Sequence, residues 1–140
     1  MPRDAVPQPV RLSDYRPPDW LVDTVDLDVR LHPTATRVIA RLALRPNPEG
    51  RAGAAIVLDG DELALKAVAL DGEPLAGSAY VATPSALTIL APPQRALVLE
   101  IETLVDPSAN TKLMGLYRSS GTYCTQCEAE GFRRITYFPD

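Results

Sequence analysis

The chain has 140 residues, of which 46% are hydrophobic and 23% charged, and its net charge is −4. This length fits one domain, and the composition is that of an average globular protein, so neither a disordered nor a membrane class is indicated. The acidic balance and the scattered arginines argue against nucleic acid as a partner, because phosphate binding requires clustered Lys and Arg. The sequence shows no long apolar run and no secretory signal pattern, which predicts a cytoplasmic protein without membrane contact.

Proline is abundant in this chain, with fourteen residues, whereas Phe and Trp are rare. Because proline removes an amide donor and breaks helix interiors, the composition does not favour a helical bundle, and a fold of mostly strands and turns is expected. Residues 1–19 are proline-rich and lack a periodic apolar pattern, so they are predicted to form an extended leader. Residues 20–140 are predicted to form a single β domain.

The first strand pattern begins at Trp20. Apolar side chains then alternate with polar ones along residues 21–31, and the side chains predicted to face the core are Leu21, Val25, Leu27, Val29 and Leu31. After the turn "HPTAT", a second alternating segment follows, with Val38, Ala40, Leu42 and Leu44 on its apolar face. The two segments are predicted to pair as an antiparallel hairpin, with acidic side chains on one outer face opposite basic ones on the other.

Short apolar runs separated by Asp-Gly and proline breaks fill the middle of the chain. Breaks at intervals of roughly 8 to 12 residues are typical of an all-β fold, an antiparallel sandwich or saddle-like pair of sheets. Residues 61–70 are rich in alanine, but the alternation of Leu63, Leu65, Ala67 and Ala69 favours a strand over a helix. Residues 105–121 are predicted to be a long loop with little helix near the C-terminus.

A C-x-x-C pair, Cys124 and Cys127, is the most conspicuous motif. Its spacing is that of half a zinc site, but a closed site needs four ligands, and the single histidine, His32, lies about ninety residues away. A redox pair would require a helix N-terminus in a βαβ unit, which the pattern does not contain. The favoured interpretation is two thiols packed as small apolar residues, with no metal ligand and no catalytic residue in the chain.

Three polar side chains follow the first cysteine at alternate positions, namely Gln126, Glu128 and Glu130. If this segment is extended, they share one face and could bind a cation such as a substrate ammonium group. A solvated strand face is the simpler interpretation that the spacing alone supports, so both alternatives stay open at this point.

Two long segments carry a family resemblance: "LSDYRPPDWLVDTVDLDVRL" (residues 12–31) and "NTKLMGLYRSSGTYCTQCEAEGFRRITYFPD" (residues 110–140). They resemble the N-terminal domain of bacterial aminopeptidase N, also called alanyl aminopeptidase, a zinc metallopeptidase of the gluzincin type. The order of strands between the two segments also fits, so the resemblance covers nearly the whole chain.

The resemblance implies a β domain that packs on a separate catalytic domain holding the zinc, in an enzyme that removes N-terminal amino acids from peptides. This chain would then be a truncated N-terminal domain, inactive alone and without its own cofactor. On matching positions, Glu128 would bind the α-ammonium group of the peptide substrate and Gln126 would lie beside the first side-chain pocket. Arg134 departs from the family, in which His or Lys is frequent, and a catalytic role is not expected there.

Two further expectations follow from this interpretation. A truncated sheet would present an uncovered edge strand, which could pair with a second copy of the chain. The alternative from another functional class is a free-standing β-sandwich module that binds other proteins and has no catalytic activity.

Overall fold

The computed structural model describes residue 9 and residues 11–139. Within this part of the chain, the regular structure consists of strands and two single-turn 3-10 helices, η1 (Leu12–Asp14) and η2 (Phe132–Arg134), and no helix is long and apolar enough to cross a membrane. The strands are β1 (Trp20–Arg30), β2 (Thr36–Pro46), β3 (Ile56–Asp59), β4 (Ala64–Leu70), β5 (Glu73–Pro74), β6 (Tyr80–Thr83), β7 (Ala86–Ile89), β8 (Leu97–Val105), β9 (Gly115–Ser119) and β10 (Thr122–Gln126). Of the predicted leader, residues 1–8 and residue 10 lie outside the described residues.

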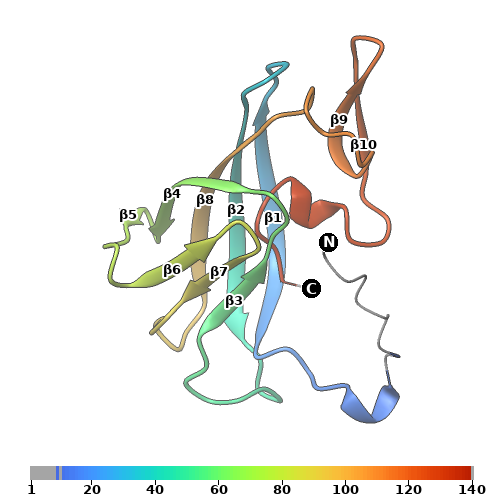
Figure 1. Cartoon of the computed structure of the whole chain (residues 1–140). Helices are drawn as coiled ribbons and strands as arrows, with labels where there is room; N and C mark the ends of the chain where they lie inside the picture. Colours follow the sequence, from blue (N-terminus) through green and yellow to red (C-terminus); the bar gives the residue numbers. More distant parts are fainter. Residues whose placement is uncertain (1–8, 10, 140) are drawn as a thin grey trace.

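The strands form three antiparallel sheets. A five-stranded sheet has the order β1-β2-β8-β4-β5, a three-stranded sheet has the order β3-β7-β6, and β9 pairs with β10 alone. In Figure 1 the three-stranded sheet lies across the five-stranded one, and the β9–β10 hairpin stands beside one end of it. The antiparallel all-β architecture expected from the sequence is confirmed.

The core lies between the two larger sheets. Alternate residues of β2 and β8 are buried on one side, and alternate residues of β3 and β7 are buried on the other. The fully or nearly fully buried side chains of this cluster are Trp20, Leu42, Leu44, Ile56, Leu58, Leu63, Val68, Leu87, Ile89, Leu97, Leu99, Ile101 and Tyr137. Their removal from water is the main favourable term in folding, at about 25 cal/mol for each Å² of apolar surface.

The predicted hairpin of β1 and β2 is present, but the core face of β1 was predicted only in part. A bulge between Val22 and Thr24 shifts the register, so that Trp20, Val22 and Val25 pack against the core instead of Leu21. A bulge inserts one extra residue and therefore moves the following side chains to the other face. Leu27 and Val29 share the face of buried β2 residues, yet each is 41% exposed, because β1 lies at the edge of the sheet.

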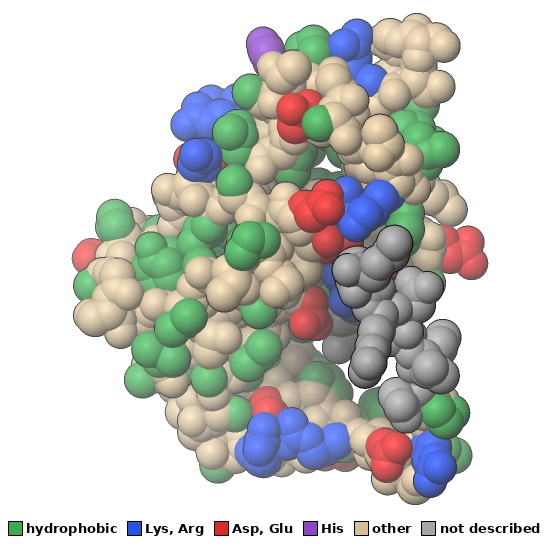
Figure 2. All heavy atoms as spheres, viewed as in Figure 1, with side chains coloured by type: hydrophobic (Ala, Val, Ile, Leu, Met, Phe, Trp, Pro, Cys, Tyr) green, Lys and Arg blue, Asp and Glu red, His purple; other side chains and the backbone are tan. Residues whose placement is uncertain are grey.

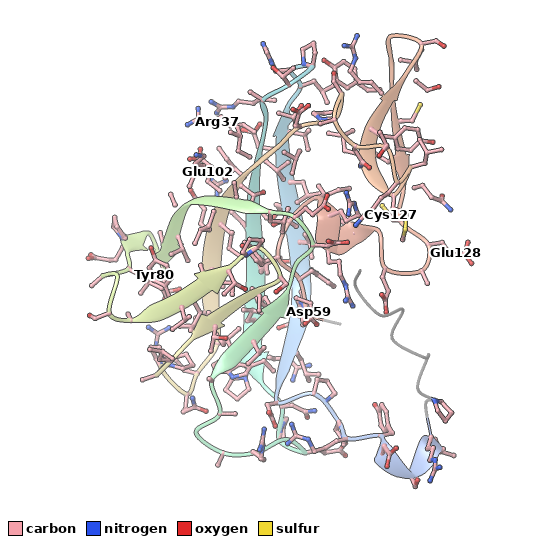
Figure 3. The ribbon with its side chains drawn as sticks, viewed as in Figure 1. Arg37, Asp59, Tyr80, Glu102, Cys127 and Glu128 are labelled. Atoms are coloured by element: carbon pink, nitrogen blue, oxygen red, sulfur yellow. The ribbon has the colours of Figure 1, made fainter. Side chains whose placement is uncertain are left out.

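Salt bridges cover the outer face of the same sheet. Arg45 pairs with Asp23 of β1 at 2.9 Å, as the acidic and basic faces of the hairpin suggested. Arg37 and Arg41 pair instead with glutamates of β8, at 3.0 and 2.9 Å, and Figure 3 labels Arg37 with its partner Glu102. Each exposed pair contributes about 0–1 kcal/mol, so the pairs supplement the core and do not replace it.

Two other predictions need correction. The segment 61–70 does contain a strand, but a bulge between Leu65 and Ala67 leaves Ala67 exposed and turns Val68 into the core. The predicted loop 105–121 contains β9, which pairs with β10. Its alternation was too short to recognise, because the strand has only five residues and begins with a glycine.

The three-stranded sheet has an exposed outer face. Val57 and Val81 flank Thr88 in one row across the sheet and are 56% and 53% exposed. Figure 2 shows hydrophobic side chains over this sheet on the viewed face. Only one side of the sheet therefore contributes to the core.

Substitution of a central core residue should destabilise the fold strongly. Leu99→Ala on β8 removes a side chain that is 0% exposed and should lower the free energy of unfolding by about 2–5 kcal/mol. Val98→Ala changes the neighbouring residue on the opposite face, which is 41% exposed, and should cost less than about 1 kcal/mol. Urea titration followed by the fluorescence of buried Trp20 measures both values, and equal losses would contradict the described core.

Asp71 fastens the β4–β5 turn to β8. Its backbone N–H donates to the carbonyl oxygen of Val98, and its carboxylate accepts the Val98 N–H, both at 2.8 Å. Arg95 adds an ion pair at 2.8 Å. The bond from the Val98 amide, followed by Arg95, holds the pKa of Asp71 below its ordinary value of 3.8. A depressed pKa means that the ionised carboxylate stabilises the folded state.

This linkage predicts a pH dependence. The contribution of Asp71 is fully present above pH 3.8, the ordinary value for an aspartate, and is lost as the pH falls through the lower folded-state value. Asp71→Asn should therefore be less stable than the parent at neutral pH, and the difference should shrink in acid. Urea titrations at several pH values from 7 down to about 2 test this, with Asp14→Asn as the control. A difference that is constant over this range would contradict the role of the charge.

Candidate functional site

The candidate binding residues lie where β10 ends. Gln126 is the last residue of β10 and pairs with Gly115, the first residue of β9. Residues 127–131 then form a turn that leads into η2, and Gln126, Glu128 and Glu130 are all exposed. Because the strand stops at Gln126, the three side chains do not form a row on one strand face, and that geometric alternative is wrong. The peptide bond after Glu128 is cis.

Glycine closes this turn. The N–H of Gly131 donates to the carbonyl oxygen of Cys127 at 2.9 Å. A Cβ atom at position 131 would collide with the carbonyl oxygen of Gln126 and would lie 2.7 Å from the Cα of Cys127. The turn therefore has no room for a side chain at this position, and it presents Glu128 on its outer side, away from the sheets (Figure 3).

Arg134 lies beneath the turn and is buried, with a side chain that is 5% exposed. Its Nη1 donates to Oδ2 of Asp61 and its Nη2 to Oε2 of Glu62, both at 2.9 Å. Its Nε donates to the carbonyl oxygen of Met114 at 3.2 Å. Arg134, the residue at which this chain differs from the family that it resembles, thus forms a structural ion pair. This is compatible with the expectation that Arg134 is not catalytic.

Arg134 and Glu62 each favour the charged form of the other. The hydrogen bond from Arg134 holds the pKa of Glu62 below its ordinary value of 4.5, and Lys112, 3.2 Å away, acts in the same direction. Burial by itself would lower the pKa of Arg134, but the two carboxylates outweigh it and raise that pKa. Arg134 and Glu62 are therefore both charged at neutral pH.

The cysteines and the histidine build no site. Cys124 is partly buried and Cys127 is exposed, and both are free thiols, so packing as small apolar residues is wrong for Cys127. His32 lies in the β1–β2 turn, where its Nδ1 accepts the N–H groups of Thr34 and Ala35. Among residues 9 and 11–139, no group of three His, Cys, Asp or Glu side chains is placed to hold a metal ion.

A shallow hollow of about 340 Å³ adjoins the turn. Its apolar part includes Phe132 and Phe138, whose rings meet edge to face with centroids 5.0 Å apart, and Glu130 and Arg133 contribute charged groups. The hollow and the Arg134 cluster were both missed by sequence reasoning. Their residues come from segments far apart in the chain, and Arg134 lies 73 positions from Asp61, so no local pattern connects them.

Comparison with known proteins gives a consistent picture, although no family model matches the chain. Aminopeptidase N of Caulobacter vibrioides is 50% identical over 138 residues, which are 99% of this chain and 16% of that protein. The crystal structure of Legionella pneumophila aminopeptidase A in complex with aspartic acid superimposes with a TM-score of 0.84 at 33% identity. That match covers 94% of this chain and 15% of the other.

A more distant structure agrees in fold. The M1 zinc metallopeptidase of Deinococcus radiodurans superimposes with a TM-score of 0.68 at 18% identity, over 87% of this chain and 29% of the other. In each case the chain spans only a small part of the relative's length. In sequence and in fold, the chain corresponds to the N-terminal domain of bacterial aminopeptidase N.

Proposed function

We propose that this chain is the substrate-binding N-terminal domain of a zinc-dependent aminopeptidase, an enzyme that releases N-terminal amino acids from peptides. The observation that carries the proposal is the 50% identity to aminopeptidase N over 99% of the chain. The match spans 16% of that relative, which supports a domain that works with a catalytic domain of the same polypeptide. A cytoplasmic location remains a prediction of the sequence, as does pairing of a free strand edge with a second copy.

Zinc fits the proposed enzyme but not this chain. The described residues gather no set of three possible ligands, and a catalytic zinc site needs about three protein ligands and an open position. We therefore assign the metal to a catalytic domain outside these 140 residues. The domain formed by the 140 residues themselves contributes binding and orientation of the substrate, and it contributes no catalytic residue.

Glu128 supplies the group that binds the substrate. A peptide N-terminus carries an ammonium group, and an exposed carboxylate accepts charge-assisted hydrogen bonds from it that are about twice as strong as neutral ones. Glu128 is exposed on the turn that directly follows β10, and the hydrogen bond from Gly131 to Cys127 closes this turn. Gln126, exposed at the end of that strand, lies two residues away and contributes an amide beside the first substrate side chain.

Orientation is the chemical benefit of such a binding group. When the α-ammonium group is held at one point, only the first peptide bond reaches the reacting centre, and the reaction becomes effectively unimolecular. This need for orientation also explains why an aminopeptidase requires an anion at a fixed distance from its catalytic groups. An endopeptidase has no free ammonium group to recognise at the cleavage site.

Removal of the Glu128 carboxylate tests the proposal directly. In the full-length enzyme, Glu128→Ala should reduce kcat/KM on amino-acyl substrates at least about tenfold, which corresponds to about 1.4 kcal/mol. Glu130→Ala is the matched control, because Glu130 lies on the same turn and is also exposed. Its ion pair with Arg133 is long, at 3.7 Å. An unchanged kcat/KM for Glu128→Ala on several substrates would refute the assignment.

The division of labour between domains gives a second prediction. The 140-residue chain alone should neither retain stoichiometric zinc after dialysis nor hydrolyse amino-acyl anilides, because it lacks a set of metal ligands in its described part. Metal analysis after dialysis and an anilide assay provide the measurement, with the full-length enzyme as the positive control. Zinc bound at one equivalent per chain would show that the metal had been assigned to the wrong part of the protein.

A further inference from the structure

Among the described residues, Arg134 is the only charged residue that is buried. A buried charge is costly unless it is paired and hydrogen-bonded. The N–H groups of Arg134 bond to acceptors in two separate segments that connect strands. Asp61 and Glu62 come from the link between β3 and β4, and Met114 comes from the link between β8 and β9. The guanidinium group therefore joins the two large sheets to the hairpin that ends in Gln126.

Arg134 lies against Gly131 and against Gly115, the strand partner of Gln126. Its N–H donates to the carbonyl oxygen of Gly131 at 3.1 Å, and Gly131 in turn bonds to Cys127. Gly115, the β9 partner of Gln126, packs so closely that an added Cβ would lie 2.7 Å from the Cβ of Arg134. Gly115 also has a φ of +74°, which a residue with a side chain adopts only under strain.

Asn110 extends the same cluster toward β9. Its Nδ2 donates to the carbonyl oxygens of Met114 and Leu116, at 2.6 and 2.9 Å, while its Oδ1 lies 3.5 Å from Nη2 of Arg134. The start of β9 is thus held by both side chains. Since β9 is the only strand that pairs with β10 in the described residues, the position of Gln126 depends on this cluster.

We propose that Arg134 is a positioning residue for substrate binding: its ion pairs with Asp61 and Glu62 hold the segment from Gln126 to Gly131 at a fixed place relative to the sheets. The inference rests on the proposed function, in which Glu128 binds the substrate ammonium group. Arg134 itself does not touch substrate, since it is buried beneath the turn. Its effect reaches the peptide through the place at which Glu128 is held.

The geometry explains why arginine suits this position. A guanidinium group is planar and has five N–H donors, so it can bond to two carboxylates and a carbonyl oxygen at once. A lysine ammonium group carries the same charge but lacks the planar arrangement. Arg134→Lys should therefore retain part of the positioning effect, and Arg134→Met should lose it while keeping most of the apolar volume.

A merely structural role and a positioning role make different kinetic predictions. If Arg134 only stabilises the fold, its replacement lowers the amount of active enzyme and leaves KM unchanged. If it positions Glu128, its replacement weakens substrate binding and raises KM, provided that Glu128 is present. The effect should then be absent when Glu128 has already been removed, because a double-mutant cycle isolates the coupling between two residues.

The experiment measures KM and kcat of the full-length enzyme on amino-acyl anilides, with the concentration of folded enzyme determined for each variant. Arg134→Met should raise KM at least about threefold with kcat within about twofold, and Arg134→Lys should fall between it and the parent. In the Glu128→Ala background, Arg134→Met should change KM by less than about 1.5-fold. Arg37→Met is the control, because Arg37 pairs with Glu102 on the outer face of the sheet and is 48% exposed.

If Arg134→Met does not fold, Glu62→Gln provides the same test from the exposed side of the cluster, because Glu62 is 61% exposed. It should raise KM in the same direction, by a smaller factor of about two, and only when Glu128 is present. The inference is overturned if Glu128→Ala weakens catalysis while the Arg134 and Glu62 variants leave KM unchanged, or if their effects are equal in both backgrounds. An inert Glu128→Ala would instead refute the proposed function.

Discussion

The rest of the structure depends on the burial of two facing sets of alternating apolar side chains. On one side they come from β2 and β8, the central strands of the five-stranded sheet, and on the other from β3 and β7. Each of the two layers buries one face against the other, and this burial holds the layers together. The connections of the remaining elements to these two sheets determine where those elements lie.

The segment after η2 shows how the core reaches the candidate site. Tyr137 is buried among the core residues and its hydroxyl donates to the carbonyl oxygen of Thr83, while Phe138 forms a two-way backbone bridge with Asp59. Arg134 lies three residues before Tyr137, so the anchoring of this segment also fixes its guanidinium group. An exposed turn is thereby tied to the buried core through a short stretch of chain.

Sequence patterns could predict those parts of the fold in which one residue in two is buried. The alternation in β2 predicted Val38, Ala40, Leu42 and Leu44 correctly, because a central strand packs along its whole length. The bulges in β1 and β4 could not be predicted, since each depends on the register that a neighbouring strand imposes. Gln126 and Glu128 were proposed as binding residues through resemblance to a family, and spacing alone did not distinguish them from a solvated face.

The Arg134 cluster illustrates why a site and its support differ in how far sequence reveals them. A binding residue, the role proposed for Glu128, must have a particular chemistry at an exposed position, which leaves a recognisable motif. The residues that hold it need only meet in space, and Asp61 and Glu62 lie more than seventy positions before their partner. Such a support can change identity between relatives as long as the new residues still fill the space and pair the charges. A departure from a family motif is therefore a reason to look for the contacts of that residue before it is dismissed as variation.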